Sequence, residues 1–238
     1  QLVGPFLELI LINQADIKNM GFDIYFSFLQ REYAVTTAGY AAHPTHVPVA
    51  KADPFVRKRS CILEMPQLVE RETIATLDRI ATDEGVLGIL SRFLCERLGE
   101  KFKEVADTDF GRRGSVFVSD LSKYIDLLAE LHSIPDTSDW EDERIVATLK
   151  VMEYLRQTNK KDTYVKYIHW LSSQHQSSNN WLEAGLALSL HMDLLSFSDE
   201  VLPAHLHFPE QTSQERKEAL MREAIELFDK GKGWEQAA

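Results

Sequence analysis

Residues 180–195 read NWLEAGLALSLHMDLL and contain the pattern that decides the fold class. Trp181 is followed after two residues by the small pair Ala184 and Gly185, and leucines then recur at helical spacing. Small residues just after a bulky aromatic allow a second helix to approach closely, as in the helical hairpins of repeat proteins. The stretch therefore predicts one helix of a closely packed antiparallel pair.

The same phrase begins a second time at residues 233–238, which read GWEQAA. Here Trp234 precedes Ala237 and Ala238, as Trp181 precedes its own small pair, but the sequence stops within the first helical turn. The other end starts at Gln1 with a core-like apolar segment and no initiator methionine. We therefore expect the sequence to be a piece of a longer protein.

The composition is that of a folded acidic protein. Hydrophobic residues make up 44% of 238 residues, which is enough for an extended core. A net charge of −11 argues against a general nucleic-acid binder, because an acidic surface repels the phosphate backbone. Cys61 and Cys95 are too few for a disulfide scaffold, so we expect reduced, packed thiols. Without a secretory signal or an apolar run of about 20 residues, the expected location is cytoplasmic.

Helical periodicity covers most of the chain. Asp16 is expected to cap a helix whose apolar face carries Ile17, Met20, Ile24 and Phe28. A glycine at 231 is expected to end the penultimate helix. Further helices are predicted from apolar spacing at residues 66–81, 85–102, 115–131, 141–157, 161–175, 179–196 and 213–230.

The breaks between these segments complete the predicted architecture. Residues 39–54 contain three prolines and predict a loop, and FGRRG at 110–114 predicts a turn. Residues 134–139 are the best candidate for a linker. No stretch alternates apolar and polar residues long enough to demand a sheet. The sequence thus predicts an all-α fold of antiparallel helix pairs in a solenoid-like array.

No motif for catalysis or for a cofactor is found. Phosphate-binding and dinucleotide-binding glycine loops and the His-Glu-x-x-His zinc motif are all absent from the sequence. The pair His205 and His207 lacks a third ligand at convincing spacing. His191 and Asp193 are two residues apart, so they would not face each other on a helix. We expect no catalytic residue, no metal and no cofactor.

An aromatic stripe gives the candidate interaction site. Tyr164, Tyr167 and Trp170 recur at three-residue spacing on one predicted helix. Such a stripe is typical of a core between helices, but aromatic residues are also enriched at protein interfaces. With Trp181 on the next helix, these four residues are the candidates for self-association, and a homodimer is the expected assembly.

Several phrases of the last third of the chain resemble the DOCK (dedicator of cytokinesis) family of guanine-nucleotide exchange factors for Rac/Rho-type GTPases. They occur in family order with comparable gaps and read YVKYI at 164–168, NWLEA at 180–184, LLSFSDE at 194–200 and FDKGKGWEQA at 228–237. The likeness continues upstream more weakly, for example at residues 7–14 and 24–32. It covers nearly the whole chain.

The resemblance implies an architecture and a role. Residues 1–138 would be the end of an armadillo-like helical-repeat region. Residues 139–238 would begin the first lobe of DOCK-homology region 2, an armadillo- or tetratricopeptide-like right-handed array that supports the exchange module and often dimerises. The Rac/Rho GTPase would bind to later lobes of the parent protein, which is recruited to membranes. The chain itself would be a scaffold, not an enzyme.

A second function stays open from the residues alone. The recurrence of Trp181 as Trp234, without any catalytic motif, also fits a generic helical-repeat adaptor with no exchange activity. An adaptor parent would continue with more helical pairs, whereas an exchange factor would continue into two further lobes.

Overall fold

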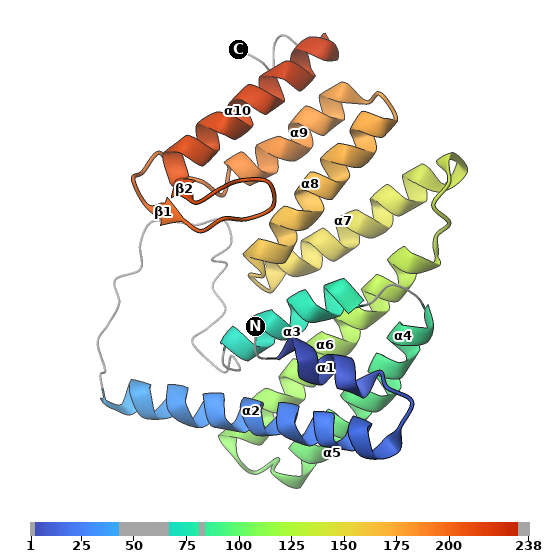
Figure 1. The fold of residues 1–238 in the computed structure, drawn as a ribbon, viewed down its shortest axis with the longest axis vertical. Helices are drawn as coiled ribbons and strands as arrows, with labels where there is room; N and C mark the ends of the chain where they lie inside the picture. Colours follow the sequence, from blue (N-terminus) through green and yellow to red (C-terminus); the bar gives the residue numbers. More distant parts are fainter. Residues whose placement is uncertain (1–2, 43–66, 81–83, 233–238) are drawn as a thin grey trace. The chain divides into compact units, whose positions relative to one another are not determined.

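The computed structural model describes residues 3–42, 67–80 and 84–232, and most of these residues lie in helices (Figure 1). The chain divides into two compact units, Gln1–Tyr154 and Leu155–Ala238. Neighbouring helices pack against each other within each unit, so the predicted helical fold class is confirmed. The right-handed repeat and the boundary at residue 138 stay predictions. No helix in the described part of the chain is long and apolar enough to cross a membrane.

The first unit contains helices of very different lengths. Residues Leu90–Cys95 form a π-helical turn that joins α4 to α5, and Ser138–Trp140 form a 3-10 turn before α7. The α-helices are α1 (Gly4–Ile10), α2 (Ala15–Ala42), α3 (Gln67–Ile80), α4 (Glu84–Ile89), α5 (Glu96–Glu104), α6 (Asp109–Ser133) and α7 (Glu141–Gln157), whose last turn lies beyond the division between the units.

The buried face of α2 differs from the predicted one. Phe22, Tyr25 and Leu29 are fully buried, whereas Met20, which was expected in the core, is 53% exposed. The helix carries apolar residues on two sides, and packing against α1 and α3 selects one of them. The expected cap was also wrong, because Asp16 lies inside the first turn of a helix that begins at Ala15. The loop predicted from residue 39 is corrected as well: α2 continues to Ala42, and residues 43–54 lie outside the described residues.

The predicted turn at residues 110–114 is wrong, because these residues form the start of α6. The N-cap is Thr108, whose hydroxyl accepts a hydrogen bond from the backbone N–H of Gly111 at 3.0 Å. Gly114 is needed for packing, since a Cβ atom there would lie 2.0 Å from Cδ1 of Phe102 on α5. The glycines that suggested a turn therefore allow α5 and α6 to pack closely.

The π-helical turn Leu90–Cys95 lies inside one otherwise continuous helix from Glu84 to Glu104, where the sequence predicted a helix. In a π-helix each N–H bonds five residues back, so the turn is wider than an α-helical turn. Leu90, Leu94 and Cys95 are all buried there. Cys95 is a free thiol, as expected, and burial raises its pKa to about 12. Cys61 lies outside the described residues.

The second unit is built from α8 (Lys161–Ser177), α9 (Trp181–Met192) and α10 (Ser213–Lys230), which lie side by side in Figure 1. Asn159 lies in the break before α8 and Asn179 lies in the break before α9, and both have a left-handed backbone conformation. α9 packs against both α8 and α10. The core of the second unit consists of buried apolar side chains, namely Ala184, Leu188, Phe208, Leu220, Ala224, Leu227 and Phe228.

The small pair after Trp181 brings the helices together, as the sequence predicts. The hydroxyl of Ser172 on α8 donates a 3.0 Å hydrogen bond to the carbonyl oxygen of Ala184 on α9. On the other side of α9, the ring of Phe228 on α10 lies against Gly185. Ala184 and Gly185 thus allow α8 and α10 to approach α9 closely.

A short hairpin between α9 and α10 departs from a purely helical fold. Strands β1 (Val201–Leu202) and β2 (Gln211–Thr212) pair antiparallel, with Val201 opposite Thr212. Two residues per strand are too few to produce an alternating sequence pattern, so the strands were not predicted. Thr212 then caps α10 in a capping box with Glu215. At the other end, Gly231 is the C-cap of α10, where the sequence predicts the end of the helix, and Lys232 after it has a left-handed backbone conformation.

Candidate functional site

The four residues predicted to mediate self-association lie in the second unit but differ in exposure. Tyr164 and Tyr167 are buried, with 6% and 8% of their surfaces accessible. Trp170 is half-buried, and so is Trp181, which packs against the core of the unit with Lys230 Nζ 5.4 Å from its ring centroid. Within one copy of the chain, Trp170 and Trp181 are therefore the two candidates with surface left for a partner.

The outer surfaces of α9 and α10 carry large aliphatic side chains. Leu186 and Leu190 are one helical turn apart on α9, on the side away from the buried Ala184 and Leu188, and are 47% and 37% exposed. Met221 and Ile225, one turn apart on α10, are exposed to a similar degree. The second unit thus keeps apolar surface outside its core.

Four histidines form a second feature of this unit, which we call the histidine cluster: His169 on α8, His191 at the end of α9, and His205 and His207 between β1 and β2. Nε2 of His169 lies 2.9 Å from Nδ1 of His191, within hydrogen-bond distance. The ring centroids of His169 and His207 are 5.3 Å apart. Phe208 lies among them, with its ring centroid 4.0–5.9 Å from those of His169, His191 and His207.

Arg216 of α10 fixes the segment that carries two of these histidines. Its guanidinium donates hydrogen bonds from Nη2 to the carbonyl oxygens of Pro203 at 2.7 Å and Pro209 at 3.0 Å. The residue is only 4% exposed, and its guanidinium carbon lies 5.6 Å from the ring centroid of Phe208. One buried cation therefore holds both ends of residues 203–209.

The electrostatics of the cluster disfavour protonation. Burial is the main cause that lowers the pKa of His191 to about 3, with further contributions from His169 and Arg216. Burial, followed by the neighbouring His207 and His205, lowers the pKa of His169 to about 4. Both rings are consequently neutral at physiological pH, with one ring nitrogen as donor and the other as acceptor.

The histidines that lie close together in the sequence have other partners in the structure. His191 contacts His169 and not Asp193, and His207 lies 3.4 Å from a carboxylate oxygen of Glu223 on α10. No group of three or more potential ligands in the described residues has the arrangement of a metal site. The cluster was missed because His169 and His191 are far apart in the sequence and meet only when α8 pairs with α9.

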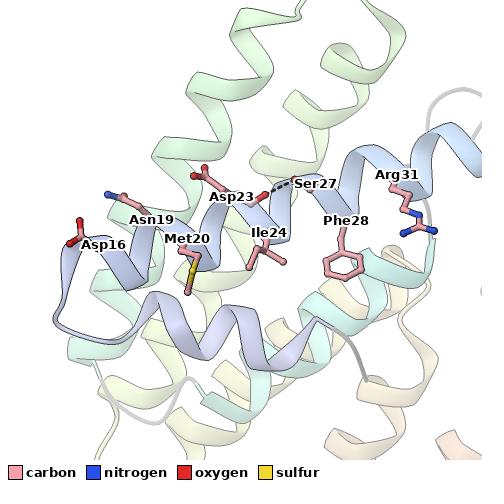
Figure 2. Close-up of a pocket in the computed structure, with 8 residues that line it drawn as sticks. All are labelled: Asp16, Asn19, Met20, Asp23, Ile24, Ser27, Phe28 and Arg31. Atoms are coloured by element: carbon pink, nitrogen blue, oxygen red, sulfur yellow. Dashed lines mark hydrogen bonds between the residues drawn. The ribbon is translucent and has the colours of Figure 1, made fainter.

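An open groove of about 600 Å³ runs along α2 in the first unit (Figure 2). Met20, Ile24 and Phe28, the face that was predicted to be buried, point to one side of the helix in Figure 2. Phe28 is covered in part by Phe6 of α1, whose ring centroid is 5.5 Å away. The described residues that line the groove all belong to α2 and include Asp16, Asn19, Asp23, Ser27 and Arg31.

Comparisons with known proteins give one consistent relationship, although no family model matches the chain. The chain is 27% identical over 242 residues to dedicator of cytokinesis protein 3 of Homo sapiens. It is 26% identical over 239 residues to dedicator of cytokinesis protein 4 of the same organism. Both similarities cover 98% of the chain. The chain is distantly similar to these DOCK proteins over nearly its whole length.

The relationship extends to fungi. DOCK-like protein 1 of Saccharomyces cerevisiae is 30% identical to the chain over 125 residues, which is 51% of the chain and 6% of that protein. The chain spans about a tenth of the length of the human DOCK proteins it matches. It is a helical segment related to DOCK proteins, and the resemblance deduced from the sequence phrases is confirmed.

Proposed function

We propose that the chain is a non-catalytic helical scaffold within a guanine-nucleotide exchange factor for Rac/Rho-family GTPases. The observation that carries the proposal is the similarity to DOCK proteins, which runs over 98% of the chain. An exchange factor accelerates GDP release by binding the nucleotide-free GTPase more tightly than the GDP-bound form. In this proposal the parent protein binds the GTPase through later lobes, and the chain positions those lobes.

The proposed division of labour assigns residues 1–138 to the end of a helical-repeat region and residues 139–238 to the first lobe of DOCK-homology region 2. The helix packing within each unit supports a scaffold role, because closely packed antiparallel helices make a stiff support. The parent acts in the cytoplasm and is recruited to membranes, and the chain needs no cofactor.

We also propose that the second unit mediates homodimerisation through α8 and α9. Its support is the half-buried Trp170 and Trp181 together with the exposed Leu186 and Leu190, since apolar and aromatic side chains concentrate in protein interfaces. Sedimentation of the 238-residue chain across a concentration series tests this. A mass that stays monomeric at the highest concentration would contradict it.

The exchange role is tested by the release of fluorescent GDP from a panel of Rac/Rho-type GTPases. Two proteins are compared, the 238-residue chain and a longer polypeptide that continues natively past Ala238. We expect no acceleration by the chain and clear acceleration by the longer protein. Exchange by the chain alone would overturn the scaffold role.

A helical-repeat adaptor without exchange activity is the second candidate. The close packing at Ala184 and Gly185, which matches the small-residue pattern of helical hairpins, is the observation that favours it. If the longer protein is folded and fails to accelerate GDP release, the adaptor function is preferred, and binding partners become the object of the search.

A further inference from the structure

We propose that the histidine cluster is an acid-sensitive lock, which holds residues 203–210 against α8, α9 and α10 at neutral pH and releases them when the solution is acidified. The lock is independent of the proposed exchange role, because it rests on the geometry of the second unit alone. The lock has three parts. They are the hydrogen bond between the imidazoles of His169 and His191, the buried Arg216 that anchors residues 203–209, and the buried ring of Phe208.

The contact between His169 and His191 is the first part of the lock. Two ring nitrogens 2.9 Å apart form a hydrogen bond only when one carries a proton and the other accepts it. If both rings become imidazolium, each of these nitrogens carries a proton and the contact turns repulsive. Acid therefore converts an attraction between α8 and α9 into a repulsion next to Phe208.

The second part is the charge of the surroundings. The groups that face these two rings are His205 and His207 from the segment and Arg216 from α10. Among the described residues, Glu223 is the carboxylate in contact with the cluster, and it lies beside the exposed His207. Each added proton is thus placed near a buried permanent cation whose partners are two neutral carbonyl groups.

The sign of the pH effect follows from the direction of both shifts. Each imidazole has a lower pKa in the folded chain than the value of about 6.5 for a free histidine. The folded arrangement is therefore fully favoured above about pH 6.5 and loses stability as the pH falls towards about 4 for His169 and about 3 for His191. Opening lets both rings take up protons in water.

The third part is what opening uncovers. Phe208 is 5% exposed and belongs to the core of the second unit with Leu188 and Leu220. When residues 203–210 leave, Phe208 leaves with them and the apolar side chains beneath become accessible. The lock thus controls access to an apolar surface on α9 and α10.

The test is hydrogen exchange of the 238-residue chain at pH 7.5 and pH 5.5, in a buffer with a chelator that removes stray divalent metals. Peptides from α6 in the first unit correct for the intrinsic pH dependence of exchange. After this correction, we expect residues 203–210 to open more often at pH 5.5 than at pH 7.5. Each of the two imidazoles, His169 and His191, should contribute a factor of about ten to the opening equilibrium. If the exchange rate of residues 203–210 changes between the two pH values only as much as that of α6, the lock is overturned.

Two variants make the test specific. His169→Gln with His191→Asn keeps a polar pair that cannot be protonated, so the extra opening at pH 5.5 should disappear. His132→Gln, on the exposed surface of α6, is the matched control and should leave it intact. An unchanged pH response in the double variant would contradict the proposal.

Should the double variant not fold, the imidazole resonances of the wild-type chain decide. In the closed chain, His169 and His191 should stay neutral until the segment opens, and their protonation should coincide with the loss of protection of residues 203–210. Protonation of both rings near pH 6.5 with the segment still protected would overturn the lock.

Discussion

Gly185 and Phe228 meet at the contact between α9 and α10, where a Cβ atom on Gly185 would lie 2.4 Å from Cε1 of the phenylalanine. No real side-chain atom tolerates such a distance, so the glycine is required by the position of the ring. The contact joins the small-residue pattern after Trp181 to the packing of the second unit.

Gly185→Ala should destabilise the chain by about 1–3 kcal/mol, because the ring must move within a packed core. Urea unfolding followed by tryptophan fluorescence measures the change. Gly99→Ala on α5 is the control, since a Cβ there meets nothing within 4 Å, and it should stabilise by about 0.5–1 kcal/mol. Adding Phe228→Leu to Gly185→Ala should recover part of the loss. Equal effects at both glycines would show that the contact is not tight.

Tyr25 and Thr73 form a fully buried hydrogen-bonded pair in the first unit, with 3.0 Å between their hydroxyl oxygens. The Thr73 hydroxyl proton goes to the carbonyl oxygen of Val69 at 2.7 Å, so Tyr25 is the donor to Thr73. Tyr25→Phe should cost about 0.5–1.5 kcal/mol of stability. In a double-mutant cycle by urea unfolding, Tyr25→Phe with Thr73→Val should cost less than the two single changes together. Strict additivity would exclude the coupling.

Thr212 begins α10 with a reciprocal capping box, in which its hydroxyl accepts from the N–H of Glu215 at 3.1 Å. Thr212→Ala should cost about 1 kcal/mol, the usual value of an N-cap. Thr212→Ser keeps the acceptor and should stay close to wild type. Thermal unfolding by circular dichroism distinguishes the two, and similar losses in both variants would point to the methyl group instead of the cap.

Arg216 holds residues 203–209 through two carbonyl groups, so its removal should loosen this segment even at neutral pH. Arg216→Met keeps much of the buried apolar volume but removes both donor bonds. We expect limited proteolysis at pH 7.5 to cleave within residues 203–210 before any other described part of the second unit. Lys217→Met is the control, since Lys217 donates to Leu195 instead. Equal resistance of both variants would remove Arg216 as the anchor.

Trp170 tests the proposed self-association. In a homodimer that uses α8, Trp170→Ala should leave the chain folded and shift it to a monomer in sedimentation experiments. Trp140→Ala, which alters a 46% exposed tryptophan in the first unit, should not change the mass. An oligomer that survives Trp170→Ala would remove this residue from the interface, and a chain that unfolds would place it in the core.

The sequence predicts α7 and α10 with their observed bounds, and α10 begins with a local start signal, the capping box of Thr212 and Glu215. The sequence-based prediction failed where one residue type serves two purposes, as glycine does in turns and in close contacts between helices. Glycines at 111 and 114 suggest a turn, yet the chain needs them inside α6. The backbone of Val105 lies against Gly111 and the ring of Phe102 lies against Gly114, and neither neighbour can be read from local spacing. Met20 looked like a core residue because α2 is apolar on two sides.

The candidate sites show the same limit. Trp170 and Trp181 could be selected from the sequence because aromatic spacing on a helix is a local pattern. The histidine cluster could not, because His169 and His191 are paired by the packing of α8 on α9, which no local spacing encodes. The nearby pair His205 and His207 was visible, but its partners were not.

The wide turn at Leu90–Cys95 has a consequence for how the chain compares with its relatives. A turn whose N–H groups bond five residues back, where the turns on either side bond four residues back, holds one additional residue. We expect this turn to mark a single-residue insertion relative to proteins with a regular helix at this place. DOCK relatives that have a regular helix at this place should align with a one-residue gap. Deleting one residue within Leu90–Cys95 should convert the turn to a regular α-helix and leave the later side chains of α5 on their present face, whereas a deletion in the regular part of the helix should turn them by about 100°.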